Sequence, residues 1–104
     1  MGKNKDIQEL ASLMAVSLRH KIGSLVNKDE VYAQKYAKDA ENIMKEAEKV
    51  LLRQHWNVSD RKRIKERLRA RLHEELQQRE FLDDKKFDMM DGEIDLALQA
   101  FELD

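Results

Sequence analysis

Length, composition and charge favour a single helical domain. The chain has 104 residues, 39% of them charged, and a net charge of −1, which fits amphipathic helices around one modest core. It has no proline, no cysteine and three glycines, which disfavours strands joined by tight turns and excludes a disulfide framework or a thiolate nucleophile. No segment has the apolar length of a membrane span or signal peptide, so we expect a cytoplasmic protein without membrane contact.

The first half of the chain predicts two helices. Between about residues 6 and 26, apolar residues recur at steps of three and four, as on one face of an α-helix. A second helix is predicted at about residues 29–54. Asn27 is its candidate cap, and Glu30 stands three residues later, as in a capping box. Its stripe is rich in alanine, which suggests that a neighbouring helix axis comes close. The two apolar stripes comprise Ile7, Ala11, Met14, Leu18, Ile22 and Leu25, then Tyr36, Ala40, Ile43, Ala47 and Val50.

The second half predicts two more helices, at about residues 60–80 and 83–101. The segment HWNVSD breaks the pattern and offers several helix caps, and Asp83 is a candidate cap for the last helix. No glycine or proline marks the boundary near Phe81, so the alternative is one long fused helix. The apolar stripe of the third helix is a narrow seam with one residue in every four: Ile64, Leu68, Leu72 and Leu76. The stripe of the fourth helix advances by three and four residues in turn: Phe87, Met90, Ile94, Ala97 and Phe101.

Four amphipathic helices with short connections predict an all-α fold, a four-helix up-down bundle or a close relative, with residues 1–104 as one domain. A bundle buries all four stripes at once. The narrow seam of the third helix would equally suit a dimer interface.

Charge is strongly sorted along the chain. Residues 59–73 carry a net charge of +5 and residues 74–104 carry −8. At about 100° per residue, the bases of the third helix form two rows beside its leucine seam, and four aspartates align on one flank of the fourth helix. The first row comprises Arg63, Arg67 and Arg71, the second row comprises Lys62, Lys65 and Arg69, and the aspartates are Asp84, Asp88, Asp91 and Asp95.

These rows support two interpretations. If a short turn folds the fourth helix back on the third, Arg71 approaches Asp84 or Asp88, Arg67 approaches Asp91, and Arg63 approaches Asp95, as a zipper of ion pairs. Alternatively, the rows stay free for a macromolecule: the bases for nucleic-acid phosphates and the aspartates for a basic protein.

Catalytic and metal motifs are weak. With Gly92 as the sixth residue of a calcium loop, Phe87 and Met89 would occupy ligand positions, which argues against an EF-hand. The stretch RLRARLHEE resembles the Arg-x4-6-His pattern of the helical HEPN ribonucleases through Arg67 and His73. That resemblance implies RNA cleavage, although Leu68 replaces the polar residue that commonly follows the arginine. In a regular helix the two side chains would point about 120° apart.

The residue pattern therefore favours a non-enzymatic interaction module, an adaptor, accessory subunit or small regulator that binds a protein partner or a second copy of itself. The alternative is an RNA- or DNA-binding module that uses the third helix, and a ribonuclease is the third candidate. His20, His55 and His73 lie on separate segments without metal-ligand spacing, so we expect no metal, cofactor or small-molecule substrate.

Overall fold

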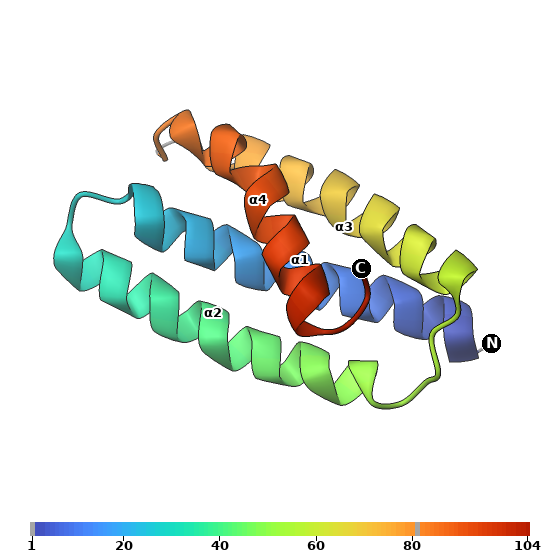
Figure 1. Cartoon of the computed structure of the whole chain (residues 1–104). Helices are drawn as coiled ribbons and strands as arrows, with labels where there is room; N and C mark the ends of the chain where they lie inside the picture. The colour runs from blue at the N-terminus through green and yellow to red at the C-terminus, as the bar shows by residue number, and fades with distance from the viewer. Residues whose placement is uncertain (1, 81) are drawn as a thin grey trace.

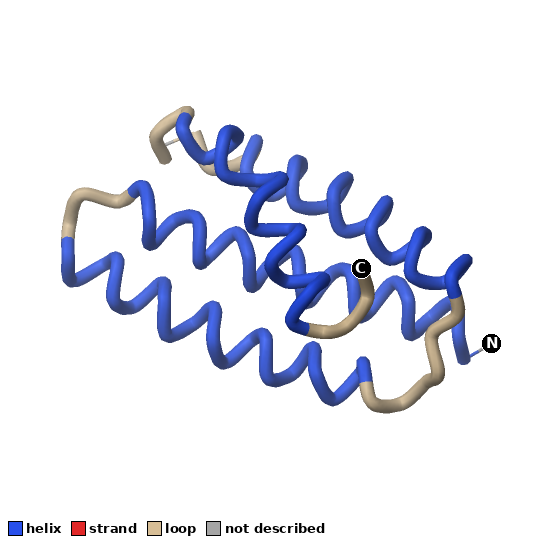
Figure 2. The backbone as a smooth tube through the Cα atoms, in the orientation of Figure 1, coloured by secondary structure: helices blue, strands red, loops and turns tan. Residues whose placement is uncertain are grey.

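The computed structural model describes residues 2–80 and 82–104, and helices make up most of this part of the chain. They are α1 (Gly2–Val26), α2 (Glu30–Leu51), α3 (Val58–Gln77) and α4 (Lys85–Ala100). Figure 1 shows α1 and α3 running in one direction and α2 and α4 in the other. Figure 2 shows the same path with no strand among the described residues. The predicted all-α bundle is confirmed.

The helix boundaries differ from the predicted ones by a few residues. Helix α1 begins at Gly2 rather than near residue 6, and α2 ends at Leu51 rather than near residue 54. The chain turns between Gln77 and Lys85, so α3 and α4 are not one fused rod. The predicted boundary residue, Phe81, lies outside the described residues.

Local hydrogen bonds explain where the helices begin. Asp29, not Asn27, caps α2: its Oδ1 accepts a hydrogen bond from the Val31 amide at 2.9 Å, while Asn27 accepts from Asp29 and shapes the turn. At α3 a full capping box forms, because Asn57 accepts from the Asp60 amide at 2.8 Å and Asp60 accepts from the Asn57 amide at 3.0 Å. Two reciprocal bonds satisfy amides that a helix start leaves free.

Helix α1 is the centre of the molecule. Helix α2 packs along α1 alone, whereas α3 and α4 pack on α1 and on each other, and α4 crosses α1 obliquely (Figure 1). The four seam residues of α3 are fully buried, as predicted.

The expectation for Leu25 was wrong: it is 54% exposed, because its side chain lies on the open side between α1 and α2, where neither α3 nor α4 covers it.

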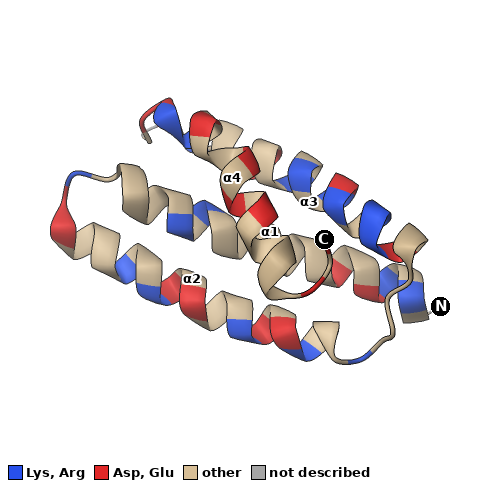
Figure 3. Cartoon of the chain, viewed as in Figure 1, with Lys and Arg blue, Asp and Glu red and all other residues tan. Residues whose placement is uncertain are grey.

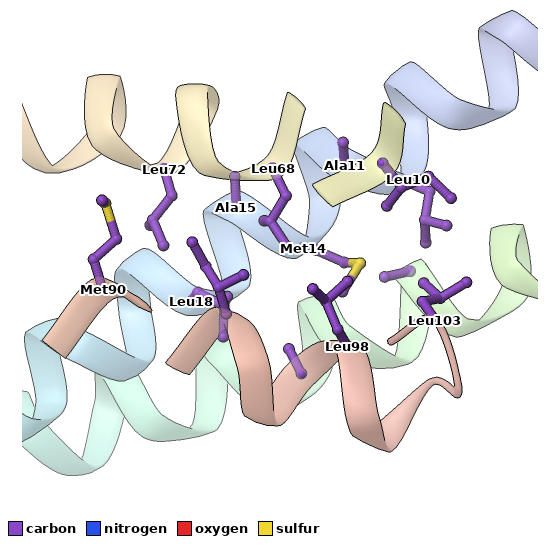
Figure 4. Close-up of a cluster of buried hydrophobic side chains, with 14 of the residues drawn as sticks. Leu10, Ala11, Met14, Ala15, Leu18, Leu68, Leu72, Met90, Leu98 and Leu103 are labelled. Atoms are coloured by element: carbon purple, nitrogen blue, oxygen red, sulfur yellow. The ribbon is translucent and has the colours of Figure 1, made fainter. Parts of the chain in front are cut away.

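The core extends past the end of α4. Glu102 adopts a left-handed conformation (φ 56°), and the Leu103 amide donates to the Leu98 carbonyl at 2.8 Å. This Schellman-type turn returns the Leu103 side chain to the core, where it is 3% exposed. Figure 4 shows Leu103 beside Leu10 and Leu98, with Met90 of α4 near Leu72 of α3.

Candidate functional surfaces

A groove of about 450 Å³ opens between α1, α2 and α4. It exists because, among the four helices, α2 packs closely against α1 alone, which leaves the backbones of α2 and α4 apart on that side of α1. Its apolar lining residues are Leu18 and Leu25 from α1, Ala37, Ala40 and Met44 from α2, and Leu96, Ala97 and Ala100 from α4. Leu18, Ala40 and Ala97 are buried, whereas Leu25 and Leu96 are each 54% exposed. The groove therefore combines a buried apolar floor with exposed apolar walls.

The charges of this groove do not balance. Lys21 and Glu93, which line it from α1 and α4, form an ion pair with each other. Glu41 lines it from α2 and has no basic partner among the ion pairs of the described residues. Glu48, likewise without a basic partner in the described part of the chain, follows seven residues later, which places it on the same flank of α2. On the α2 side the lining itself therefore carries one negative charge, that of Glu41, while Lys38 and Lys45 lie on the same flank of α2 but farther round from the groove.

The predicted ion-pair zipper has the wrong register. Asp91 pairs with Arg69 and not with Arg67. Arg71 pairs with Glu75 of its own helix at 3.1 Å, and Arg63 donates to Asn4 of α1 at 2.6 Å. The reason is that the α3 seam is buried against both α1 and α4. Helix α1 lies along the flank that carries Arg63, Arg67 and Arg71, and α4 lies along the other flank, where Asp91 meets Arg69.

All four aspartates of the acidic row are exposed, and Figure 3 shows acidic positions along α4. Asp95 lies in a hollow of about 340 Å³ whose other charged residues include Lys62 and Lys65 of α3. Asp84 and Asp88 stand at the start of α4, where the helix dipole favours negative charge. The row therefore faces α3 through Asp91 and Asp95 and faces solvent at its beginning.

The basic rows divide into two halves. Arg69 and Arg71, in the later half of α3, are neutralised by Asp91 and Glu75. In the earlier half, Lys62, Lys65 and Arg67 are exposed and have no carboxylate partner among the ion pairs of residues 2–80 and 82–104. Among the predicted binding residues, Arg69 and Arg71 thus form ion pairs within the chain. The charges of Lys62, Lys65 and Arg67 remain available to a ligand.

Sequence reasoning missed a cluster around Glu75. This carboxylate is 9% exposed, and it lies 3.3 Å from Arg19 of α1, 3.1 Å from Arg71 and 3.9 Å from Arg79. Burial, followed by the charge of Arg79, lowers the pKa of Arg19, and Glu75 opposes this shift. The spacing of four residues from Arg71 to Glu75 to Arg79 was the available signal, whereas the contact with Arg19 required the packing of α1 on α3.

The ribonuclease-like residues point to different neighbours. Arg67 lines a hollow with Gln8 and Ser12 of α1, and the His73 ring packs against Phe87 of α4 with the ring centres 5.4 Å apart. The structure does not bring them together. Within the described residues, no group of three His, Cys, Asp or Glu side chains is placed to hold a metal ion, and none of the helices described is long and apolar enough to cross a membrane.

Comparison of the chain with protein-family models, curated proteins and solved structures finds no match.

Proposed function

We propose that this chain is a cytoplasmic protein-binding module, an adaptor, accessory subunit or small regulator, that holds an amphipathic helix of a partner protein in the groove between α1, α2 and α4. The observation that carries the proposal is the groove itself, which leaves apolar walls on α1 and α4 and one flank of α2 uncovered. An amphipathic helix laid in an apolar groove is a recurrent mode of protein recognition.

The small residues of the groove suit a helical occupant. Ala37, Ala40, Ala97 and Ala100 leave space between α2 and α4, so a partner helix can approach the backbone closely. Burying the exposed parts of Leu25 and Leu96 under that helix supplies hydrophobic free energy, at about 25 cal/mol per Å² of apolar surface.

Charge specifies the flank of the partner helix. Lys21 is already paired with Glu93, so Glu41 and Glu48 are the charges left for the partner to complement. A basic flank on the bound helix pairs with them, whereas an acidic flank is repelled. The proposed occupant is therefore a helix with an apolar stripe and a row of lysines or arginines beside it.

Two synthetic amphipathic peptides test this proposal. They share one leucine stripe and differ only in carrying lysine or glutamate on its flank; binding to the purified chain is followed by fluorescence anisotropy. The lysine peptide is expected to bind tighter by roughly 2- to 30-fold, because two exposed ion pairs together contribute about 0.4 to 2 kcal/mol. Glu41→Lys should shift the preference toward the glutamate peptide.

A matched pair of variants locates the binding. Leu96→Gln removes an exposed apolar side chain from the groove wall and should weaken binding, whereas Leu52→Gln makes the same change at an exposed leucine outside the groove and should not. Equal effects of the two variants contradict the proposal. So does a concentration-dependent dimer in light scattering that Leu96→Gln dissociates, because the groove would then hold a second copy of the chain.

A further inference from the structure

The first half of α3 carries unused positive charge on both sides of its solvent-facing ridge. Lys62 and Lys65 lie on the α4 side, Arg63 and Arg67 on the α1 side. Arg63 donates to the neutral amide of Asn4 and lies near Asp60, whose carboxylate is already paired with Lys3. The other three have no carboxylate partner among the ion pairs of the described residues. Residues 62–67 thus carry four cations and one carboxylate, that of exposed Glu66, which lies on the ridge between the two rows; the net charge of this stretch is +3.

Helical geometry sets these cations in two rows. At about 100° per residue, the solvent-facing ridge between Lys62 and Arg63 spans roughly 100°. Rows on opposite shoulders of one exposed helix can reach phosphates on the two sides of a groove. The major groove of B-form DNA is about 12 Å wide and admits an α-helix, whereas the major groove of A-form RNA is too narrow and deep.

We infer that the first half of α3 is a docking surface for duplex DNA, with Lys62 and Lys65 contacting one phosphate backbone and Arg63 and Arg67 the other. This surface is separate from the groove and does not depend on the function proposed for it. The contacts are to phosphates, so the binding is electrostatic and largely independent of sequence.

Other polyanions fit this surface less well. Single-strand binders stack bases on aromatic side chains, but residues 58–71 of α3 include none. Trp56, just before α3, packs against the core and donates to the Leu51 carbonyl at 2.8 Å. A helix that lies on a lipid surface carries an apolar face beside its bases. Between Lys62 and Arg71 the apolar residues of α3 are buried in the core, apart from the small side chain of Ala70.

Fluorescence anisotropy of a labelled 20-base-pair DNA duplex, titrated with the full chain at several salt concentrations, tests the inference. Four phosphate contacts predict that log K falls against log salt concentration with a slope of roughly −3 to −4. Arg67→Glu and Lys62→Glu should each weaken binding and reduce the magnitude of that slope by about 1. Asp95→Asn should tighten binding, since Asp95 lies in the hollow beside Lys62 and Lys65.

Lys38→Glu, at an exposed lysine of α2, makes the same charge change away from α3 and should leave binding as it is. Circular dichroism checks that each variant keeps its helix content. The inference is overturned if the duplex does not bind, if Lys38→Glu weakens binding as much as Arg67→Glu, or if a single strand, duplex RNA or phosphatidylserine vesicles bind more tightly than duplex DNA.

Discussion

Two glycines show how local packing decides what one residue contributes. Gly23 and Gly92 both lie inside helices with ordinary helical backbone angles. A Cβ atom at Gly92 would meet nothing within 4 Å, whereas one at Gly23 would lie 3.2 Å from the Tyr36 ring. A side chain at position 23 would therefore press on the Tyr36 ring at the α1–α2 contact, whereas one at position 92 has open space.

Gly92→Ala should stabilise the protein by up to about 1 kcal/mol, because alanine loses less backbone entropy in a helix than glycine. Urea unfolding measures this as a higher midpoint with an unchanged slope. Gly23→Ala makes the same chemical change and should stabilise less, or destabilise, since the Tyr36 ring must move. Equal stabilisation by both substitutions contradicts the packing described for Tyr36.

Two buried carboxylates make stability depend on pH. A hydrogen bond from Gln54, aided by Arg53, lowers the pKa of Asp6, and hydrogen bonds from Lys3 and the Asn57 amide lower the pKa of Asp60, both from 3.8. A carboxyl with a lower pKa in the folded state contributes stability above its unfolded-state pKa. That contribution is lost as the pH falls through the folded-state pKa, because the unfolded chain takes up protons first.

Thermal unfolding followed by circular dichroism should therefore show a Tm that changes little between pH 7 and about pH 5 and falls below about pH 4. Asp60→Asn should lower the Tm at neutral pH and make the acid-dependent part of the curve smaller. A variant whose acid-dependent loss of Tm matches that of the unmodified chain would show that Asp60 contributes nothing to it.

Among the elements, the sequence predicted each helix and most of its buried stripe, Leu25 being an exception, but not which flank of α3 meets α4. The leucine seam has bases on both shoulders, and helical spacing treats the two shoulders alike. In the structure, α1 packs on the side of α3 that carries Arg67. Helix α4 therefore packs on the side that carries Arg69. The register of the ion pairs was unpredictable for this reason.

A double-mutant cycle tests this register. Arg69→Ala and Asp91→Ala should couple by about 0.2 to 1 kcal/mol, the usual range for an exposed pair. Arg67→Ala, the matched change on the other shoulder, should combine additively with Asp91→Ala. Urea unfolding of the single and double variants gives both coupling energies, and a coupling at Arg67 without one at Arg69 would restore the register expected from the sequence.

At the scale of the whole molecule, the bundle is open on one side. The exposed surface is 6684 Å², about a tenth more than the roughly 6,100 Å² typical of a compact monomer of this mass. An elongated shape of 41 × 22 × 21 Å and the uncovered flank of α2 both add to this surface. The sequence did not predict the opening, because the alanine-rich stripe of α2 suits one neighbour as well as two. Leu96, an apolar residue outside the stripe of α4, was the one available signal.

The most direct test of the protein-binding proposal is to map the lysine-flanked peptide on the chain by NMR. Backbone amide signals of the isotope-labelled protein are followed while the peptide is added. We expect the largest shifts on residues that line the groove, such as Ala37, Met44, Leu96 and Ala100, while the signals of α3 change little. Shifts that gather on α3, or no shifts at peptide concentrations where anisotropy reports binding, would contradict it.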